Sequence, residues 1–301
     1  LLFEKAYRVS HTSARMVEFE IPDVDYTRYS NRQLVAIPLA ILGLALVILL
    51  GNFLITGTSP VSLGMAFTGG TELRIQTADT QPQIERTFDA DVESIAPIRS
   101  EENEYIVTFP PSDADPQQQA QAAGYEVISS QERAASFGAD TQRQAFIGIG
   151  VAFLGMALLV FGLFRTFIPS IAVVASAFSD IVIPVALMSL FDIPLTLGTV
   201  AALLMLIGYS VDSDLLLNNH VLRRRGDFYE STYRAMRTGV TMTLTSIAAM
   251  TAMTITASLL AIDLLPSVGI ILVFGLVADL MNTYLLNVSL LRYYKYEAVA
   301  Q

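Results

Sequence analysis

The segment LVAIPLAILGLALVILLGNFL, residues 34–54, decides the class of this protein, because it runs for 21 residues without a charged side chain. A bilayer hydrocarbon core of about 30 Å needs about 20 apolar residues in a helix. The composition agrees: 53% of the 301 residues are hydrophobic, 15% are charged and the mean hydropathy is +0.52, whereas a soluble domain is about 25% charged. The sequence therefore predicts an integral membrane protein.

Five further apolar segments of spanning length follow, at residues 145–164, 168–191, 193–217, 239–262 and 265–291. They predict an α-helical protein with six transmembrane helices, in which a polar segment separates the first helix from the rest. The predicted division is a cytoplasmic N-terminal segment at 1–33, the first span at 34–54, an extracytoplasmic domain at 57–144, a five-span bundle at 145–291 and a cytoplasmic tail at 292–301.

Basic residues indicate the orientation of the spans. The link 218–238 contains five Arg and two acidic residues. Arg165 and Arg292 lie on the same side of the predicted membrane as this link. The links on the opposite side contain no basic residue. Since short basic loops stay in the cytoplasm, both termini are predicted to be cytoplasmic, in a multi-pass protein of the plasma membrane.

The polar segment has the periodicity of a small mixed domain. Strands are predicted at residues 71–75, 92–98, 105–109 and 125–129, and helices at 81–88 and 113–123. This β-α-β-β-α-β order is typical of a ferredoxin-like α+β fold. The segment holds 5 Arg against 14 acids, and it contains neither a Ser-His-Asp set nor a glycine-rich phosphate loop. A docking or polypeptide-handling module is therefore favoured over an enzyme.

Charge and cysteine content exclude several classes of function. The net charge of −10 argues against nucleic acid as a partner, because binding a polyphosphate needs a concentrated positive surface. There is no Cys, and the two His, His11 and His220, lie far apart in the sequence. A zinc site is not expected, and no cofactor is expected beyond a proton or sodium ion. An intramembrane hydrolase is disfavoured because no paired carboxylates or Ser-Lys arrangement lies at workable spacing.

Asp180 is the clearest candidate for a functional residue. An ionisable group inside a bilayer costs at least about 2.5 kcal/mol, so each one is a functional-site hypothesis. Asp180 lies in the middle of the span 168–191, and Pro184 follows four residues later. Because proline has no N–H, the carbonyl of residue 180 loses its helical donor, and water, a proton or a small cation is expected beside it. A plain proline kink, with Asp180 bonded to a neighbouring helix, is the open alternative.

Two further spans carry acids. Asp212 and Asp214 stand near the cytoplasmic end of the fourth span, where a hydrated interfacial role is an equal alternative. Asp279 lies in the sixth span with Asn282, and helical spacing places it on one face with Thr283 and Asn287. Arg234, just before the fifth span, marks the cytoplasmic side; a sharper hypothesis pairs it with Asp212 or Asp214.

Two motifs stand out: Phe67, Thr68, Gly69 and Gly70 after the first span, and Gly208, Tyr209 and Ser210 in the fourth. With these motifs the chain resembles the SecF branch of the SecD/SecF protein-export family over residues 34–291. Asp180 and Arg234 fall where the family carries an acid and an Arg. The run 212–214 reads Asp-Ser-Asp where bacterial members read Asn-Asp-Thr, which indicates the archaeal branch and leaves open which aspartate takes the family role.

The resemblance implies half of a transporter of the resistance-nodulation-division type. Such a protein would couple a proton or sodium gradient to movements that draw a translocating polypeptide outward. It would work in membrane lipid with SecD as partner and the Sec channel as client. The ion-coupling residues implied are Asp180, Asp212, Asp214, Asp279 and Arg234. The alternatives are a small-solute or lipid exporter of the same superfamily and a non-conducting structural subunit of the translocon.

Overall fold

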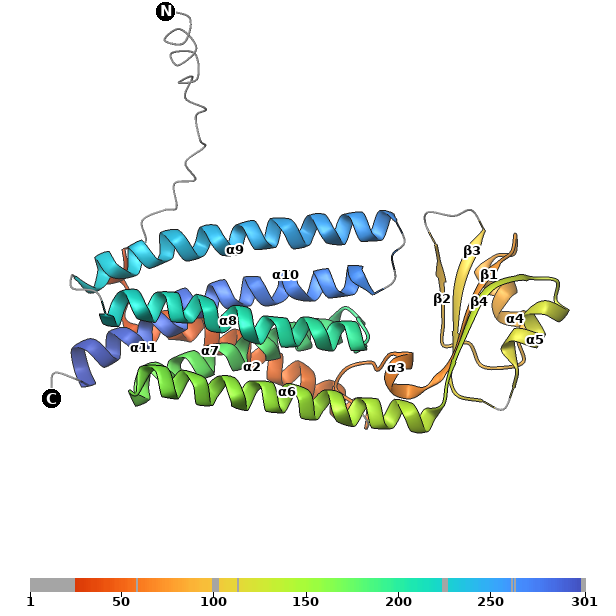
Figure 1. Ribbon diagram of the computed structural model, residues 1–301, viewed down its shortest axis with the longest axis horizontal. Coiled ribbons are helices and arrows are strands. Elements are labelled where there is room, and N and C mark those ends of the chain that lie inside the picture. Colours follow the sequence, from red (N-terminus) through yellow and green to blue (C-terminus); the bar gives the residue numbers. More distant parts are fainter. Residues whose placement is uncertain are drawn as a thin grey trace, which may run out of the picture.

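The computed structural model describes residues 25–57, 59–98, 103–112, 114–223, 227–260, 262 and 264–298. Six long apolar helices form a bundle, and a small sheet with two short helices lies at one end of it (Figure 1). Residues 1–24 of the predicted N-terminal segment 1–33 and residues 299–301 of the predicted tail 292–301 lie outside the described residues, as do Arg224, Arg225 and Asp113.

The prediction of six spans is confirmed. The first five are α2 (Asn31–Thr56), α6 (Ala135–Phe164), α7 (Phe167–Leu190), α8 (Leu197–Arg223) and α9 (Phe228–Leu259); the sixth joins α10 (Leu265–Met281), η2 (Asn282–Asn287), α11 (Val288–Tyr293) and η3 (Tyr294–Ala298). Two of the helices begin about ten residues earlier than predicted, at Ala135 and at Phe228. Hydropathy detects only the apolar part of a helix, and the Asp227 side chain caps α9 by accepting from the Tyr229 N–H.

Within the bundle, α7, α8 and α10 are central, and α2, α6 and α9 are mostly exposed along their apolar windows. Exposed large side chains of the outer helices include Leu44 and Leu54 on α2 and Leu154 and Leu158 on α6. Apolar exposure of this extent suits contact with lipid or with a partner's helices. The central trio carries all three acids discussed below.

The small domain predicted to be extracytoplasmic is called the external domain. It has the predicted element order: β1 (Gly70–Gln76), α4 (Gln81–Thr87), β2 (Ser94–Pro97), β3 (Glu104–Phe109), α5 (Pro116–Ala122) and β4 (Glu126–Arg133). The sheet is antiparallel in the order β2-β3-β1-β4, which is the ferredoxin-like arrangement. Leu73, Ile75 and Val107 form its core with Ile84 of α4. The fold class expected from the sequence is therefore confirmed.

A glycine-rich joint connects this domain to the bundle. After the short helix α3 (Met65–Thr68), Gly69 and Gly70 have φ values of 76° and 121°, a region that glycine tolerates best. A β-carbon on Gly70 would lie 2.2 Å from the Phe109 carbonyl oxygen, and one on Gly69 would lie 2.7 Å from the Ala135 backbone. The FTGG element thus brings the sheet directly against the start of α6.

Candidate functional site

Three buried acids come from the three central helices. Asp180 on α7, Asp214 on α8 and Asp279 on α10 are 1%, 0% and 1% exposed. Each contacts polar side chains of another helix, so their helices share one polar interior. The structure thereby joins positions that are far apart in the sequence.

Both carboxylate oxygens of Asp180 accept a hydrogen bond. Ser210 Oγ of α8 donates to Asp180 Oδ2 at 2.6 Å, and Asn282 Nδ2 of the sixth span donates to Asp180 Oδ1 at 2.6 Å. Asp180 therefore ties three helices together. Pro184 lies inside the continuous helix α7, and the bonds from α8 and the sixth span are those that the structural alternative for Asp180 expected.

Asp214 and Asp279 are only half satisfied. Thr283 Oγ1 and Asn287 Nδ2 donate to Asp214 Oδ1 at 2.9 and 2.8 Å. Ser213 Oγ donates to Asp279 Oδ1 at 2.6 Å. The Oδ2 atoms of both aspartates are buried without a hydrogen-bond partner among the described residues.

Among the described residues, the hydrogen-bond donors to the three carboxylates are hydroxyl and amide groups, which supply no positive charge. Ionising all three together would bury like charges in one place, at a cost that hydroxyl and amide donors only partly offset. A proton would turn an unpartnered carboxyl oxygen into a donor, and a small monovalent cation would give it a ligand. The cluster therefore has the groups that binding either a proton or a small monovalent cation would require.

The amide and hydroxyl groups of the sixth span come from a π-helical segment. Asn282, Thr283 and Asn287 all lie in η2 and are fully buried. A π-helical turn inserts one extra residue into an α-helix and is frequent at functional sites. The wider turn lets Asn282 reach Asp180 on α7 while Thr283 and Asn287 reach Asp214 on α8.

The structure separates the two aspartates of the fourth span. Asp214 belongs to the buried cluster, whereas Asp212 is exposed. Residues two positions apart on an α-helix are rotated by about 200° about its axis, so only one of Asp212 and Asp214 can face the interior. Of the two, Asp214 is the one whose position suits the role implied for the family acid.

Arg234 lies away from the cluster. It forms an ion pair with Glu230 at 2.7 Å on an exposed side of α9. The hypothesis that pairs Arg234 with Asp212 or Asp214 is therefore not realised in this structure. The i,i+4 spacing of Glu230 and Arg234 on one helix explains the local pairing.

The remaining motif residues have structural places. Ser210 contacts Asp180 directly, and the Tyr209 hydroxyl bonds Thr243 on α9 at 3.2 Å. Gly208 has open space where a β-carbon would stand. Two further polar residues, Ser176 and Asn218, were not predicted, and their side-chain polar atoms are buried and unpartnered among the described residues. Ser176 lies four residues before Asp180, a same-face spacing that could have revealed it.

The family model for the C-terminal part of the protein export membrane proteins SecD and SecF matches residues 115–297. The chain belongs to this family. Among curated relatives, SecF of Haloferax volcanii is 62% identical, with alignment over 95% of this chain and 100% of the relative. SecF of Haloquadratum walsbyi is 60% identical over the same shares. These SecF proteins match along their whole length.

A solved structure shares the SecF-type fold found here. The crystal structure of SecDF from Thermus thermophilus, described as a translocon-associated membrane protein, has a TM-score of 0.69 at 19% identity. The match covers 91% of this chain but only 39% of that chain. This chain therefore spans well under half of the SecDF polypeptide.

Proposed function

We propose that this chain is the SecF subunit of a SecD–SecF complex that supports protein export across the plasma membrane. Membership of the family and full-length likeness to SecF relatives support this assignment. The observation that carries the mechanism is the buried cluster of Asp180, Asp214 and Asp279, in which two carboxylate oxygens lack partners among the described residues.

In the proposed cycle a proton or sodium ion neutralises the cluster and then leaves on the other side of the membrane. Binding changes which carboxylate oxygens accept from Thr283 and Asn287, and hence how α8 packs against the sixth span. One charge crossing 100 mV releases about 2.3 kcal/mol. That energy is enough to bias a conformational equilibrium of a few kcal/mol. No bond-breaking active site is part of this proposal.

SecD is the proposed partner, and the Sec channel with its translocating polypeptide is the proposed client. The outer faces of α2, α6 and α9 are largely apolar and exposed, as an incomplete half of a larger bundle would be. The Arg-bearing ends of the helices, at Arg165 and Arg292, lie opposite the external domain. By the positive-inside rule we place both termini in the cytoplasm.

An exporter of small solutes or lipids is less well supported. Such a protein would need an apolar pocket within the external domain, but the interior of that domain is filled by Phe109, Ile84 and their neighbours. The hollows of 360 and 340 Å³ lie between the sheet and the outer ends of the spans, where Ile106 and Leu264 line both. They are open to the outside rather than enclosed.

The test replaces single acids in an archaeal host that lacks its own SecF. We expect Asp180→Asn and Asp214→Asn to lower the export rate of a secreted reporter by about tenfold or more, equivalent to about 1.4 kcal/mol, while co-purification with SecD is kept. Asp212→Asn is the matched comparison on the same helix and should retain export. Full export by the Asp180 and Asp214 variants would contradict ion coupling through these acids and would mean that the chain is only a structural subunit of the translocon.

A further inference from the structure

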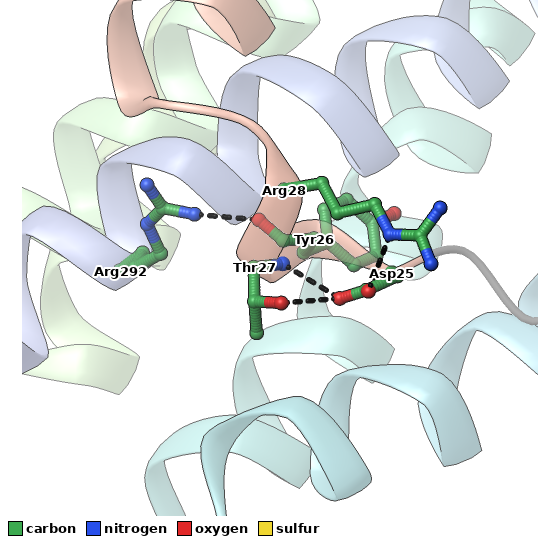
Figure 2. A network of polar contacts seen from close by, with 5 residues as sticks. All are labelled: Asp25, Tyr26, Thr27, Arg28 and Arg292. Carbon is green, nitrogen blue, oxygen red and sulfur yellow. Dashed lines mark hydrogen bonds and ion pairs between the residues drawn. The ribbon is translucent and has the colours of Figure 1, made fainter.

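A short segment before the first span enters the cytoplasmic end of the bundle. The 3-10 turn η1 (Tyr26–Arg28) is capped by Asp25, whose carboxylate accepts from the Thr27 N–H at 3.1 Å and from Arg28 Nε at 2.9 Å. On the other side, Arg292 Nη1 donates to the Tyr26 carbonyl at 2.9 Å (Figure 2). The turn is thus fixed from both sides, and Tyr26 itself is only 4% exposed.

The Tyr26 hydroxyl contacts the π-helical segment. It donates to the Tyr284 carbonyl at 3.1 Å. In a regular α-helix that carbonyl would accept from the Val288 N–H. Here the Val288 N–H is directed at the carbonyls of Thr283 and Leu285 instead. Tyr26 therefore supplies a donor to the carbonyl that the π-turn has deprived of its usual partner, in a buried place where an unpaired carbonyl is costly.

The side chain of Tyr284 is held as well. Its hydroxyl donates to the Ala235 carbonyl of α9 at 3.5 Å. A β-carbon on Gly239 would lie 2.0 Å from that hydroxyl, so glycine is what allows Tyr284 to approach α9 so closely. Tyr26 also reaches α9, with its hydroxyl 3.6 Å from Met236 Sδ. The π-turn is thus fixed at its backbone by Tyr26 and at its side chain by the start of α9.

The same turn carries the donors to the buried acids. Asn282 precedes Tyr284 by two residues and bonds Asp180, while Asn287 follows by three and bonds Asp214. Returning the π-turn to α-geometry would rotate one flank by about 100° relative to the other. Asn282 and Asn287 could not then both keep their carboxylate partners. The register of this turn decides whether both acids receive amide donors.

We propose that Tyr26 is a positioning residue that holds the π-turn of the sixth span in the register at which Asn282 and Asn287 serve Asp180 and Asp214. The inference rests on the proposed function, because it assigns an ion-coupling role to those acids. Burial raises the pKa of Tyr26 to about 12, so its hydroxyl keeps the proton that it donates throughout the physiological range.

The test compares Tyr26→Phe, which removes only the hydroxyl, with Tyr29→Phe, an exposed tyrosine at the end of the same turn. Side-chain amide resonances of Asn-labelled protein in lipid are assigned with Asn282→Ser and Asn287→Ser. We expect Tyr26→Phe to shift both resonances and Tyr29→Phe to shift neither. Arg292→Gln, which removes the arginine donor and leaves the Tyr26 carbonyl only the Tyr29 N–H at 3.4 Å, should shift them in the same direction and serves if Tyr26→Phe does not fold.

Unchanged Asn282 and Asn287 resonances in the folded variants, or an equal change in Tyr29→Phe, would overturn the inference. The functional readout is the export rate against external pH. In Tyr26→Phe, the loss of one neutral hydrogen bond should move the external pH at which the export rate is half-maximal by about 0.4 to 1.1 units. The resonances do not depend on ion coupling, so full export by Asp180→Asn together with shifted resonances would refute the proposed function alone.

Discussion

At the scale of single residues, each buried acid depends on a few neutral donors. Ser213 is the most critical for Asp279, because Ser213 Oγ lies 2.6 Å from Oδ1 and Oδ2 has no partner among the described residues. We expect Ser213→Ala to lower the free energy of unfolding by about 1 to 3 kcal/mol, since the buried Asp279 carboxylate loses its closer donor and keeps only Thr283 Oγ1 at 3.4 Å. Thermal unfolding of the protein in lipid measures this loss.

Ser246→Ala is the control for that prediction. Ser246 Oγ donates only along its own helix, to the Met242 carbonyl at 3.0 Å. The carbonyl keeps its helical N–H partner when such a bond is removed, so its loss should change the stability little. Equal destabilisation by Ser213→Ala and Ser246→Ala would contradict a special role for the Ser213–Asp279 contact.

The acids themselves could be named from the sequence, because an ionisable group in an apolar run is expensive wherever the helices pack. The choice between Asp212 and Asp214 could not, because it depends on how α8 is rotated against its neighbours. The pairing of Arg234 failed for a related reason. A local partner, Glu230, lies one turn away on α9, and one oxygen of the distant Asp214 carboxylate already accepts from Thr283 and Asn287.

At the scale of elements, the joint between the external domain and the bundle is sensitive to any side chain at Gly70. Its φ of 121° strains a non-glycine residue, and a β-carbon would meet the Phe109 carbonyl oxygen at 2.2 Å. We expect Gly70→Ala to cost at least about 2 kcal/mol, from backbone strain and overpacking together. Protease cleavage near residue 70 should become faster in the intact protein.

Gly124→Ala gives the comparison for the joint. Gly124 also has a positive φ, of 84°, but nothing lies within 4 Å of its added β-carbon. Its cost should be limited to the backbone preference of about 1 kcal/mol. A joint that resists protease equally well in Gly70→Ala and Gly124→Ala would show that the close approach to Phe109 is unimportant.

The spans and the small sheet were predictable because hydropathy and strand alternation are local signals. The π-turn was not. Spacing alone placed Asp279, Thr283 and Asn287 on one face, as α-geometry requires, and gave no sign that Asn282 would reach a different helix. The extra residue of the turn is stabilised by contacts from Tyr26 and α9, which are more than 40 positions away in the sequence.

At the scale of the whole molecule, the cluster of buried acids and the external domain are connected through few elements. The sheet is joined to the bundle through α3 and the start of α6. A β-carbon on Gly138 of α6 would lie 2.7 Å from the Phe67 carbonyl oxygen of α3, so glycine is what permits this close contact. A second contact joins Leu63 and Leu195, near the outer ends of the spans. Movement of the central helices can therefore reach the external domain along both routes.

Charge imbalance makes the external domain sensitive to salt. The segment 57–144 holds 5 Arg against 14 acids, so its acids repel one another when screening is weak. Raising NaCl from about 0.1 M to about 1 M shortens the screening length from about 10 Å to about 3 Å. If screening relieves about 1 kcal/mol of repulsion, the unfolding midpoint of a domain of this size should rise by about 4 to 8 °C.

Hydrogen exchange at Leu73 and Val107, in the core of the sheet, follows this unfolding in the intact protein in lipid. The double variant Glu85→Gln, Glu93→Gln removes two exposed acids and should respond less steeply to salt, because fewer like charges remain to be screened. Sucrose at matched osmolality is the control for preferential exclusion of the solute from the protein surface. That effect should stabilise the parent and the double variant equally, whereas charge screening should not. Parallel salt curves for the parent and the double variant would mean that the acidic surface does not limit the stability of this domain.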